Sequence, residues 1–187
     1  MTAAGGHGHR PGALAAVDTV DAAVDRWFES LRGRTGPDTA ATVVSGLGDQ
    51  GVLWMLVTAA RGRRSGPARR AAVRALGVAG VSSALVNGGI KAVVGRTRPD
   101  RSTLELAGAV PLREPSTSSF PSGHTLAAFC AATVLSRPGH PAANVGLFAA
   151  AGAVGVSRIH LRAHHASDVA GGIAVGVALG LLGRRLL

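Results

Sequence analysis

Five apolar stretches occupy most of the chain after residue 40 and limit the folds open to it. They run over Thr42–Ala60, Val73–Gly95, Gly123–Ser136, Ala142–Val156 and Val169–Gly183. A membrane-spanning helix needs about 20 predominantly apolar residues, and some uncharged runs here are shorter, while Asp49 interrupts the first stretch. Flanking arginines can extend a span by snorkelling. We therefore expect an all-α chain that forms an integral membrane bundle of about five apolar helices. Composition alone leaves a soluble helical bundle open.

The apolar residues are mostly Ala, Gly, Val and Leu, and aromatic residues are scarce. The sequence has no Tyr, 2 Trp and 4 Phe. Small residues let membrane helices pack closely, whereas strands favour aromatic and β-branched side chains. This composition favours a helical bundle over a β-sandwich.

Residues Leu14 to Leu31 have the pattern of an amphipathic helix, predicted over residues 13–34. Leu14, Val17, Val20, Val24, Trp27, Phe28 and Leu31 recur at three- and four-residue steps, and Asp18, Asp21, Asp25 and Glu29 fall mostly on the other side. With these acids the helix cannot span a bilayer, so we expect it to lie at the interface or to cap the bundle. Residues 1–12 are predicted to be a disordered tail, and 13–187 a single domain with its bundle over 38–187.

The formal net charge of +10 raises the question of an anionic partner. No basic stretch is interleaved with aromatics and no nucleic-acid-binding motif is visible, so we expect no nucleic-acid partner. Cys130 is the only cysteine, which excludes an intramolecular disulfide. No signal peptide is expected before the domain.

The positions of the arginines predict a membrane topology. The basic groups of Arg61–Arg74 and Arg184–Arg185 belong on the cytoplasmic side by the positive-inside rule. Alternation of the helices then places the Arg96–Pro121 loop and the Ser157–Asp168 segment together on the extracytoplasmic face. A polar loop as long as Arg96–Pro121 is usually functional or disordered.

Three short segments carry the residue types needed for phosphate chemistry. In the first, Lys91 ends an apolar stretch and Arg98 follows seven residues later, before Pro99. Two cations at this separation can converge on one oxyanion, the arginine as a planar fork and the lysine as a point charge. Both could instead anchor the helix end at the interface, but Lys91 is the only lysine in a chain that otherwise uses arginine.

The second segment is Pro121-Ser122-Gly123-His124, which opens an apolar stretch. Ser122 is a candidate N-cap, and the backbone N–H groups of Gly123 and His124 would then form an anion site at the helix N-terminus. His124 could donate a proton to a leaving oxygen. The alternative is a capped helix with an incidental histidine.

The third segment runs from Ser157 to Asp168. His164 and Asp168 are four residues apart and would share one face of a helix, where the carboxylate could fix the imidazole tautomer and leave the other nitrogen as a nucleophile. Arg158 adds a phosphate clamp. An i,i+4 surface ion pair is the alternative. His160, Arg162 and His165 receive no role and are interpreted as interfacial bystanders.

In this order the three segments resemble the motifs of the type-2 phosphatidic acid phosphatase superfamily. They read Lys-x6-Arg-Pro, Pro-Ser-Gly-His and Ser-Arg-x5-His-x3-Asp, and every specified position is filled at the family's spacing. The resemblance covers nearly half of the chain, from Lys91 to Asp168, and does not reach the residues before about Asp38.

The resemblance implies roles for individual residues. His164 would be the nucleophile that forms a phosphohistidine, Asp168 would orient it, and His124 would protonate the leaving oxygen and later activate water. Lys91, Arg98, Ser122, Gly123 and Arg158 would hold the phosphate oxygens. No metal or other cofactor is implied, because fixed cations and a helix N-terminus offset the phosphate charge.

The resemblance leaves several substrates open. Family members act on phosphatidic acid, phosphatidylglycerol phosphate or polyprenyl phosphates and diphosphates, and vanadate-dependent haloperoxidases share the oxyanion pocket as a remote alternative. The Ala-, Gly- and Arg-rich composition points to a high-GC bacterium, where small members act on polyprenyl carriers such as decaprenylphosphoryl-phosphoribose or undecaprenyl diphosphate. We therefore expect a lipid-phosphate phosphatase in the plasma (inner) membrane, of undetermined oligomeric state.

Overall fold

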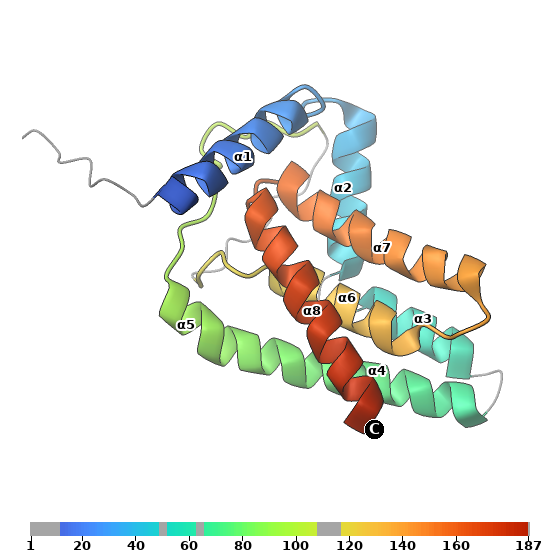
Figure 1. The fold of residues 1–187 in the computed structure, drawn as a ribbon. Coiled ribbons are helices and arrows are strands. Elements are labelled where there is room, and N and C mark those ends of the chain that lie inside the picture. Colours follow the sequence, from blue (N-terminus) through green and yellow to red (C-terminus); the bar gives the residue numbers. More distant parts are fainter. Residues whose placement is uncertain (1–11, 49–51, 63–65, 108–116, 187) are drawn as a thin grey trace, which may run out of the picture.

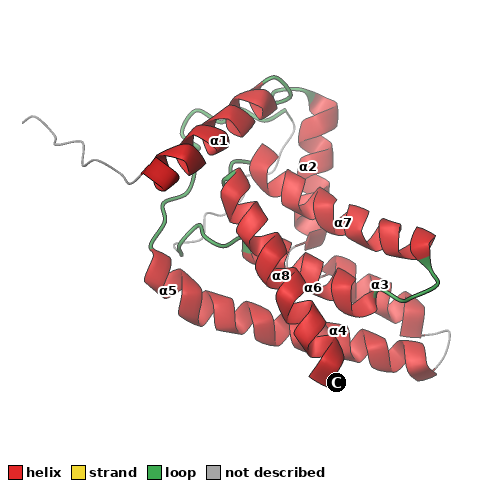
Figure 2. Ribbon diagram, in the orientation of Figure 1, coloured by secondary structure: helices red, strands yellow, loops and turns green. Residues whose placement is uncertain are grey.

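The computed structural model describes residues 12–48, 52–62, 66–107 and 117–186, and all regular secondary structure in these ranges is helical (Figures 1 and 2). The helices are α1 (Gly12–Glu29), α2 (Thr35–Gly48), α3 (Val52–Gly62), α4 (Gly66–Leu85), α5 (Lys91–Val94), α6 (Gly123–Leu135), α7 (Pro141–His160) and α8 (Ala166–Leu186), with a π-helical turn η2 at Val86–Ile90. The expected disordered tail lies outside the described residues, apart from residue 12.

The first apolar stretch does not form one helix. Its residues belong to α2 and α3, which run in different directions (Figure 1), while Asp49 itself lies outside the described residues. The expectation of one helix over Thr42–Ala60 was wrong, because the helical pattern of an apolar run does not reveal where the chain changes direction.

The second apolar stretch forms one long helical segment from α4 through η2 to α5. The π turn at Val86–Ile90 comes directly before Lys91. Such turns are frequent next to functional sites. Lys91 thus stands at the last helical turn before the polar loop, as the sequence predicts.

Helix α6 is the centre of the bundle. Eight of its residues, Thr125, Leu126, Ala128, Cys130, Ala131, Ala132, Thr133 and Leu135, are buried. It packs against α4, α7 and above all α8. The hydrophobic core around it includes Trp54 of α3, Leu135 of α6 and Val154 of α7.

Glycines on α8 allow its very close approach to α6. A Cβ atom at Gly172 would lie 2.7 Å from the carbonyl oxygen of Ser122, and one at Gly176 would lie 2.5 Å from that of Leu126. One turn further on, Gly180 meets Thr133 in the same way, with 2.7 Å to its Cβ. This small-residue stripe at four-residue spacing lets the two backbones touch, and it fixes the start of α6 beside the start of α8.

Two of the described helices are long and apolar enough to cross a membrane. Pro141–His160 has a mean hydropathy of 1.4, and Ala166–Arg185 has one of 1.6. Helix α6 is apolar but only 13 residues long.

Helix α1 lies against the start of α8 and the end of α7 (Figure 1). Its acidic side faces the bundle: Asp21 is only 5% exposed, whereas Val20 and Trp27 are 59% and 62% exposed. Ala16 and Ala23, at the same helical spacing, are exposed as well. The predicted amphipathic helix is therefore observed, and several of its apolar residues point away from the bundle.

The two ends of the bundle differ in character. The end of α5, the end of α7 and the starts of α6 and α8 lie on the side of α1, whereas the start of α4 and the end of α8 lie on the far side (Figure 1). Arg184, near the end of α8, donates to Ser136 Oγ at 3.1 Å and so joins the far ends of α8 and α6. The basic residues Arg69, Arg70, Arg184 and Arg185 are thereby separated from the three motif segments.

Candidate active site

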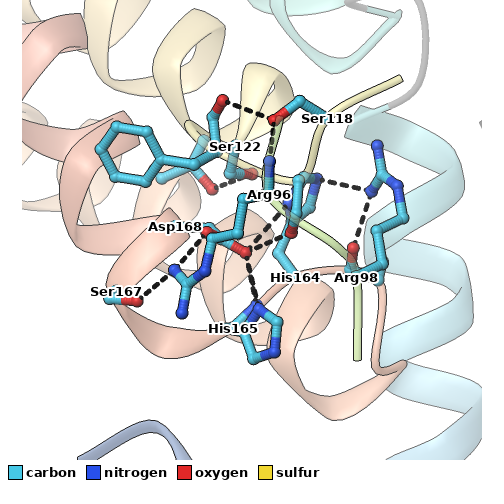
Figure 3. A network of polar contacts seen from close by, with 12 residues as sticks. Arg96, Arg98, Ser118, Ser122, His164, His165, Ser167 and Asp168 are labelled. Carbon is cyan, nitrogen blue, oxygen red and sulfur yellow. Dashed lines mark hydrogen bonds and ion pairs between the residues drawn. The ribbon is translucent and has the colours of Figure 1, made fainter. Parts of the chain in front are cut away.

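The three motif segments meet at the end of the bundle that carries α1 (Figure 3). Arg98 comes from the loop after α5, Ser122 from the residue before α6, His164 from the loop between α7 and α8, and Asp168 from the first turn of α8. Folding thus joins residues that are separated by up to about half of the chain.

His164 is the centre of this group. Its side chain is 2% exposed and lies between Asp168 and Arg98 (Figure 3). The Arg98 guanidinium approaches His164 Nε2 at 3.3 Å and donates to the Ala163 carbonyl at 2.7 Å. On the other side, His164 Nδ1 is 3.7 Å from Asp168 Oδ2. A proton on Nδ1 would face the carboxylate and leave the Nε2 lone pair available.

The His164–Asp168 pair is arranged differently from the sequence expectation. His164 precedes α8 and does not share a helix with Asp168. Their 3.7 Å separation exceeds a hydrogen bond, and Nδ1 has no hydrogen-bond partner among the described residues. The two groups are close, but Asp168 is held by other residues.

Asp168 is completely buried and held through both of its oxygens. Oδ1 accepts from Arg96 at 2.7 Å. Oδ2 accepts a short hydrogen bond from the Ser119 hydroxyl and another from the His165 backbone N–H at 2.8 Å. The His165 ring contacts the same oxygen at 3.2 Å. These partners fix the orientation of the carboxylate.

The surroundings of His164 keep its imidazole neutral. The pKa of His164 is lowered to about 4: burial is the largest cause, Asp168 opposes it, and the positive charges of Arg98 and Arg158 act in the same direction as burial. A neutral imidazole is the form that can act as a nucleophile.

Three cations lie near one another beside His164, and Arg98 is the one in contact with its Nε2. The buried Lys91 lies within electrostatic range of Arg98 and Arg158. Arg158 is also buried and donates to Ser45 Oγ on α2. Like charges brought together in a buried site are unfavourable unless an anion joins them. The structure therefore brings Lys91, Arg98 and Arg158 near one another, and their binding of an oxyanion stays a prediction.

The Pro-Ser-Gly-His segment begins α6 beside this cluster. Ser122 occupies the N-cap position but makes no side-chain cap bond, and its hydroxyl accepts from Thr125 instead. The Ser122 backbone N–H donates to the Asp168 carbonyl at 3.0 Å, which joins α6 to α8. Gly123 is the first residue of α6. The next residue, His124, lies against α2, with Cδ2 3.9 Å from a Cβ atom placed at Gly48.

A backbone motif at the end of α7 places His164. Arg162 has a φ of 48°, in the left-handed region that usually favours glycine. The N–H of Ala163 donates to the Arg158 carbonyl and that of Arg162 to the Ile159 carbonyl, both at 2.9 Å. This is the Schellman pattern of helix termination. It ends α7 and turns the chain so that His164 returns toward Arg158.

The interpretation of His160, Arg162 and His165 as bystanders was wrong. His160 is buried, and its Nε2 lies 2.7 Å from Asp38 Oδ1 on α2. Arg162 forms ion pairs with Asp25 and Glu29 of α1, at 3.0 Å and 2.9 Å. These partners of His160 and Arg162 lie more than 100 residues earlier in the chain, so local sequence patterns could not reveal them. His165 instead contacts Asp168, three residues later.

Sequence reasoning missed further residues at this end of the bundle. Arg96 binds Asp168 and Asp21 at 2.7 Å each. Ser119 bonds to Asp168, and Asp38 also accepts from the Ala107 N–H at 2.8 Å. The proximity of Arg96 to Arg98 was a visible signal, since both flank the polar loop, but nothing in the sequence pairs it with Asp21.

A cleft of about 460 Å³ opens beside His164. Its walls include Asp18, Asp25 and Asp100, Pro99, Arg162, and His164 itself. Residues of both α1 and the loop after α5 line the cleft, so it provides a polar approach to His164.

Comparison with known proteins identifies a matching family model and a similar protein. The family model of the PAP2 superfamily matches residues 72–187. The lipid A 1-phosphatase of Porphyromonas gingivalis is 39% identical over 114 residues, which are 58% of this chain and 22% of that protein. This chain thus spans about a fifth of the length of that relative.

Two solved structures have similar folds. A transmembrane PAP2-type phosphatidylglycerolphosphate phosphatase from Bacillus subtilis aligns with a TM-score of 0.70 and 26% identity, over 91% of this chain and 86% of that one. LpxE of Aquifex aeolicus aligns with a TM-score of 0.68 over 88% of this chain and 94% of that one, and at 24% identity it shows the fold alone. The predicted all-α membrane fold is confirmed.

Proposed function

Because this chain belongs to the PAP2 superfamily, we propose that it removes a phosphate group from a membrane lipid through a phosphohistidine on His164. Its membership confirms the family, and with it the class of phosphatase enzyme, that the sequence motifs predict. The observation that carries the proposal is the position of His164. A buried, neutral imidazole lies between a fixed carboxylate and a cluster of cations.

The proposed reaction has two steps. His164 Nε2 attacks phosphorus, a P–N bond forms, and the bond from phosphorus to the leaving oxygen breaks while His124 gives that oxygen its proton. Water then attacks phosphorus, His124 takes a proton from it, and the P–N bond breaks to release phosphate and restore His164. Asp168 stabilises the positive charge that the His164 ring carries in the phosphohistidine intermediate.

Fixed positive groups stabilise the charge of the transferring phosphoryl group. Lys91, Arg98 and Arg158 supply three cations, and the start of α6 supplies the backbone N–H groups of Gly123 and His124. These groups are positioned before the substrate arrives, which is the condition for efficient electrostatic catalysis.

For the substrate, we propose a polyprenyl-linked cell-wall precursor such as decaprenylphosphoryl-phosphoribose or undecaprenyl diphosphate. The Ala-, Gly- and Arg-rich composition and the short chain support this choice. Phosphatidic acid and phosphatidylglycerol phosphate are the alternatives, and the Bacillus subtilis structure is that of a phosphatase for the latter. We place the enzyme in the plasma membrane, with its site on the extracytoplasmic face.

Phosphate release from a panel of these lipids tests the proposal. We expect His164→Ala and His124→Ala to abolish release while the purified proteins keep their helical content. His140→Ala is the matched control, because His140 is exposed and precedes α7, and it should keep wild-type activity. Wild-type protein stopped during turnover should carry an acid-labile phosphohistidine that His164→Ala lacks.

Three outcomes would contradict the proposal. One is turnover that survives His164→Ala, and another is strong inhibition by EDTA, because the proposed chemistry uses side-chain cations. The third is vanadate-dependent halide oxidation without phosphatase activity, which would favour the haloperoxidase alternative.

A further inference from the structure

Arg96 lies between two carboxylates from opposite ends of the chain. Its guanidinium is 2.7 Å from Asp21 of α1 and 2.7 Å from Asp168 of α8 (Figure 3 shows the contact with Asp168). Both carboxylates are buried, with side chains 4% and 0% exposed. Burial lowers the pKa of Arg96, whereas Asp21 and Asp168 raise it, and the net effect is a raised pKa. Arg96 therefore stays charged and is shared between the two acids.

Asp21 also caps the helix that carries Asp168. The Ser167 backbone N–H donates to Asp21 Oδ1 at 2.8 Å, and the Ser167 hydroxyl donates to Oδ2 at 2.6 Å. Ser167 is in the first turn of α8, where backbone N–H groups lack partners within the helix. An N-cap side chain normally fills this role. Here the residue before the helix is His165, and Asp21 supplies the carboxylate from α1.

Asp168 completes the same cap from within α8. It is the third residue of the helix, and its Oδ2 accepts from the His165 backbone N–H at 2.8 Å. This is the reciprocal contact of a capping box. The orientation of Asp168 thus depends on the first turn of α8, which Asp21 holds in place.

We propose that Asp21 is a positioning residue for the His164–Asp168 pair, acting through Arg96 and the first turn of α8. The inference rests on the proposed function of His164 and Asp168. Asp21 balances the charge of Arg96, so that Asp168 keeps enough negative charge to stabilise the imidazolium that forms at His164. Asp18 of α1 lies farther from Arg96, at 4.0 Å. Without Asp21, Asp168 would be the one close carboxylate left to Arg96 among the described residues, and Arg96 would compete with His164 for its charge.

Turnover of the full-length protein in lipid micelles gives the first test. We expect Asp21→Asn to lower kcat by roughly tenfold to a hundredfold, as small misplacements of catalytic groups do, with KM changed by less than about twofold. Asp21→Glu should recover part of the lost kcat, because it restores the charge opposite Arg96. Glu29→Gln is the matched control: Glu29 lies on the same helix, is not among the residues that line the cleft, and pairs with Arg32 and Arg162, not with Arg96.

A second readout does not depend on turnover. The charged groups acting on His164 are Arg98 of the loop, Arg158 of α7 and Asp168 of α8, with Arg96 behind Asp168. In ¹⁵N-histidine spectra, assigned with His164→Ala, Asp21→Asn should move the titration midpoint of His164 below its wild-type value, since it removes a negative charge. Glu29→Gln should leave the midpoint unchanged.

The results separate this proposal from the proposed function. If wild-type protein releases no phosphate, the function fails, and the spectra still decide the role of Asp21. An unchanged His164 midpoint in Asp21→Asn would overturn the inference. So would a midpoint that rises toward an ordinary histidine value, because that result means exposure of His164 by a loosened fold.

Discussion

Burial of His164 decides its protonation state. Four neighbouring residues have side chains in polar or ionic contacts, namely His160, Arg162, His164 and His165. Among them, His164 is the one that lies against both Arg98 and Asp168. Its Nε2 faces the cation cluster, whereas His160 and His165 face carboxylates. The different surroundings, and not the residue type, separate a nucleophile from a structural histidine.

The lowered pKa of His164 predicts how stability depends on pH. The folded protein has a pKa of about 4 at His164, below the ordinary value of 6.5. The unfolded chain therefore binds more protons between these values, and stability falls as pH drops through this window, by roughly 3 kcal/mol in all. Thermal unfolding in detergent should show a steeper loss from pH 6.5 to 4 for wild type than for His164→Gln. Equal slopes would mean that His164 has an ordinary pKa.

Close contact between α6 and α8 determines the geometry of the site at the level of the elements. The carbonyl of Ser122 lies against Gly172, and the N–H of Ser122 binds the carbonyl of Asp168. The Pro-Ser-Gly-His segment and the His164–Asp168 pair are therefore positioned by one helix–helix interface. The glycines of α8 therefore position the site residues as well as allowing close packing in the core.

Gly176→Ala should destabilise the bundle, because its Cβ would lie 2.5 Å from the Leu126 carbonyl oxygen. We expect a loss of about 1–3 kcal/mol, as overpacked cores show, measured by unfolding in detergent. Gly152→Ala on α7 is the control. Nothing lies within 4 Å of a Cβ at that position, so the change should be neutral or stabilising by up to about 1 kcal/mol. Equal losses in both variants would refute the close-packing argument.

Helix α1 presents an apolar surface away from the site. Val20 and Trp27 are exposed, while Asp21 binds Arg96 and Ser167 on the opposite side. Such a helix can lie in the membrane interface with its apolar face toward lipid.

The exposed side of α1 leads to a test with vesicles. Trp27→Asp should lower kcat/KM on lipid in vesicles by at least about threefold, since it removes a large apolar contact, while turnover of a short-chain soluble phosphate ester should stay near wild type. Thr19→Asp on the same helix is the control, because Thr19 is exposed and polar. Equal losses on both substrates would point to damage at the site instead of a membrane contact.

At the scale of the whole molecule, the arginines of α4 and α8 and the candidate active site lie at opposite ends of the bundle. The exposed Arg69, Arg70, Arg184 and Arg185 belong to the start of α4 and the end of α8, whereas α1 and the start of α8 lie at the other end (Figure 1). Arg26 and Arg34 are exposed at the end that carries α1. With the positive-inside rule this arrangement favours an extracytoplasmic site.

Topology reporters test that arrangement. A reporter fused within Arg61–Arg74 should read cytoplasmic, and one near Thr103 should read extracytoplasmic, because only positive charge near the helix ends resists translocation. A reporter in the Arg137–Pro141 turn should also read cytoplasmic. The reverse pattern would place the site on the cytoplasmic side.

The sequence alone was sufficient to predict the family of this protein, because the motif residues occur at local spacings that the family shares. Apolar runs likewise predicted most helices, since a helix depends on neighbours three or four residues away. The tertiary structure alone decided that α2 and α3 are separate, that Asp21 and Arg96 join the site, and that His160 pairs with Asp38. These contacts link residues roughly 75 to 120 positions apart, and only folding brings such distant side chains within hydrogen-bonding distance.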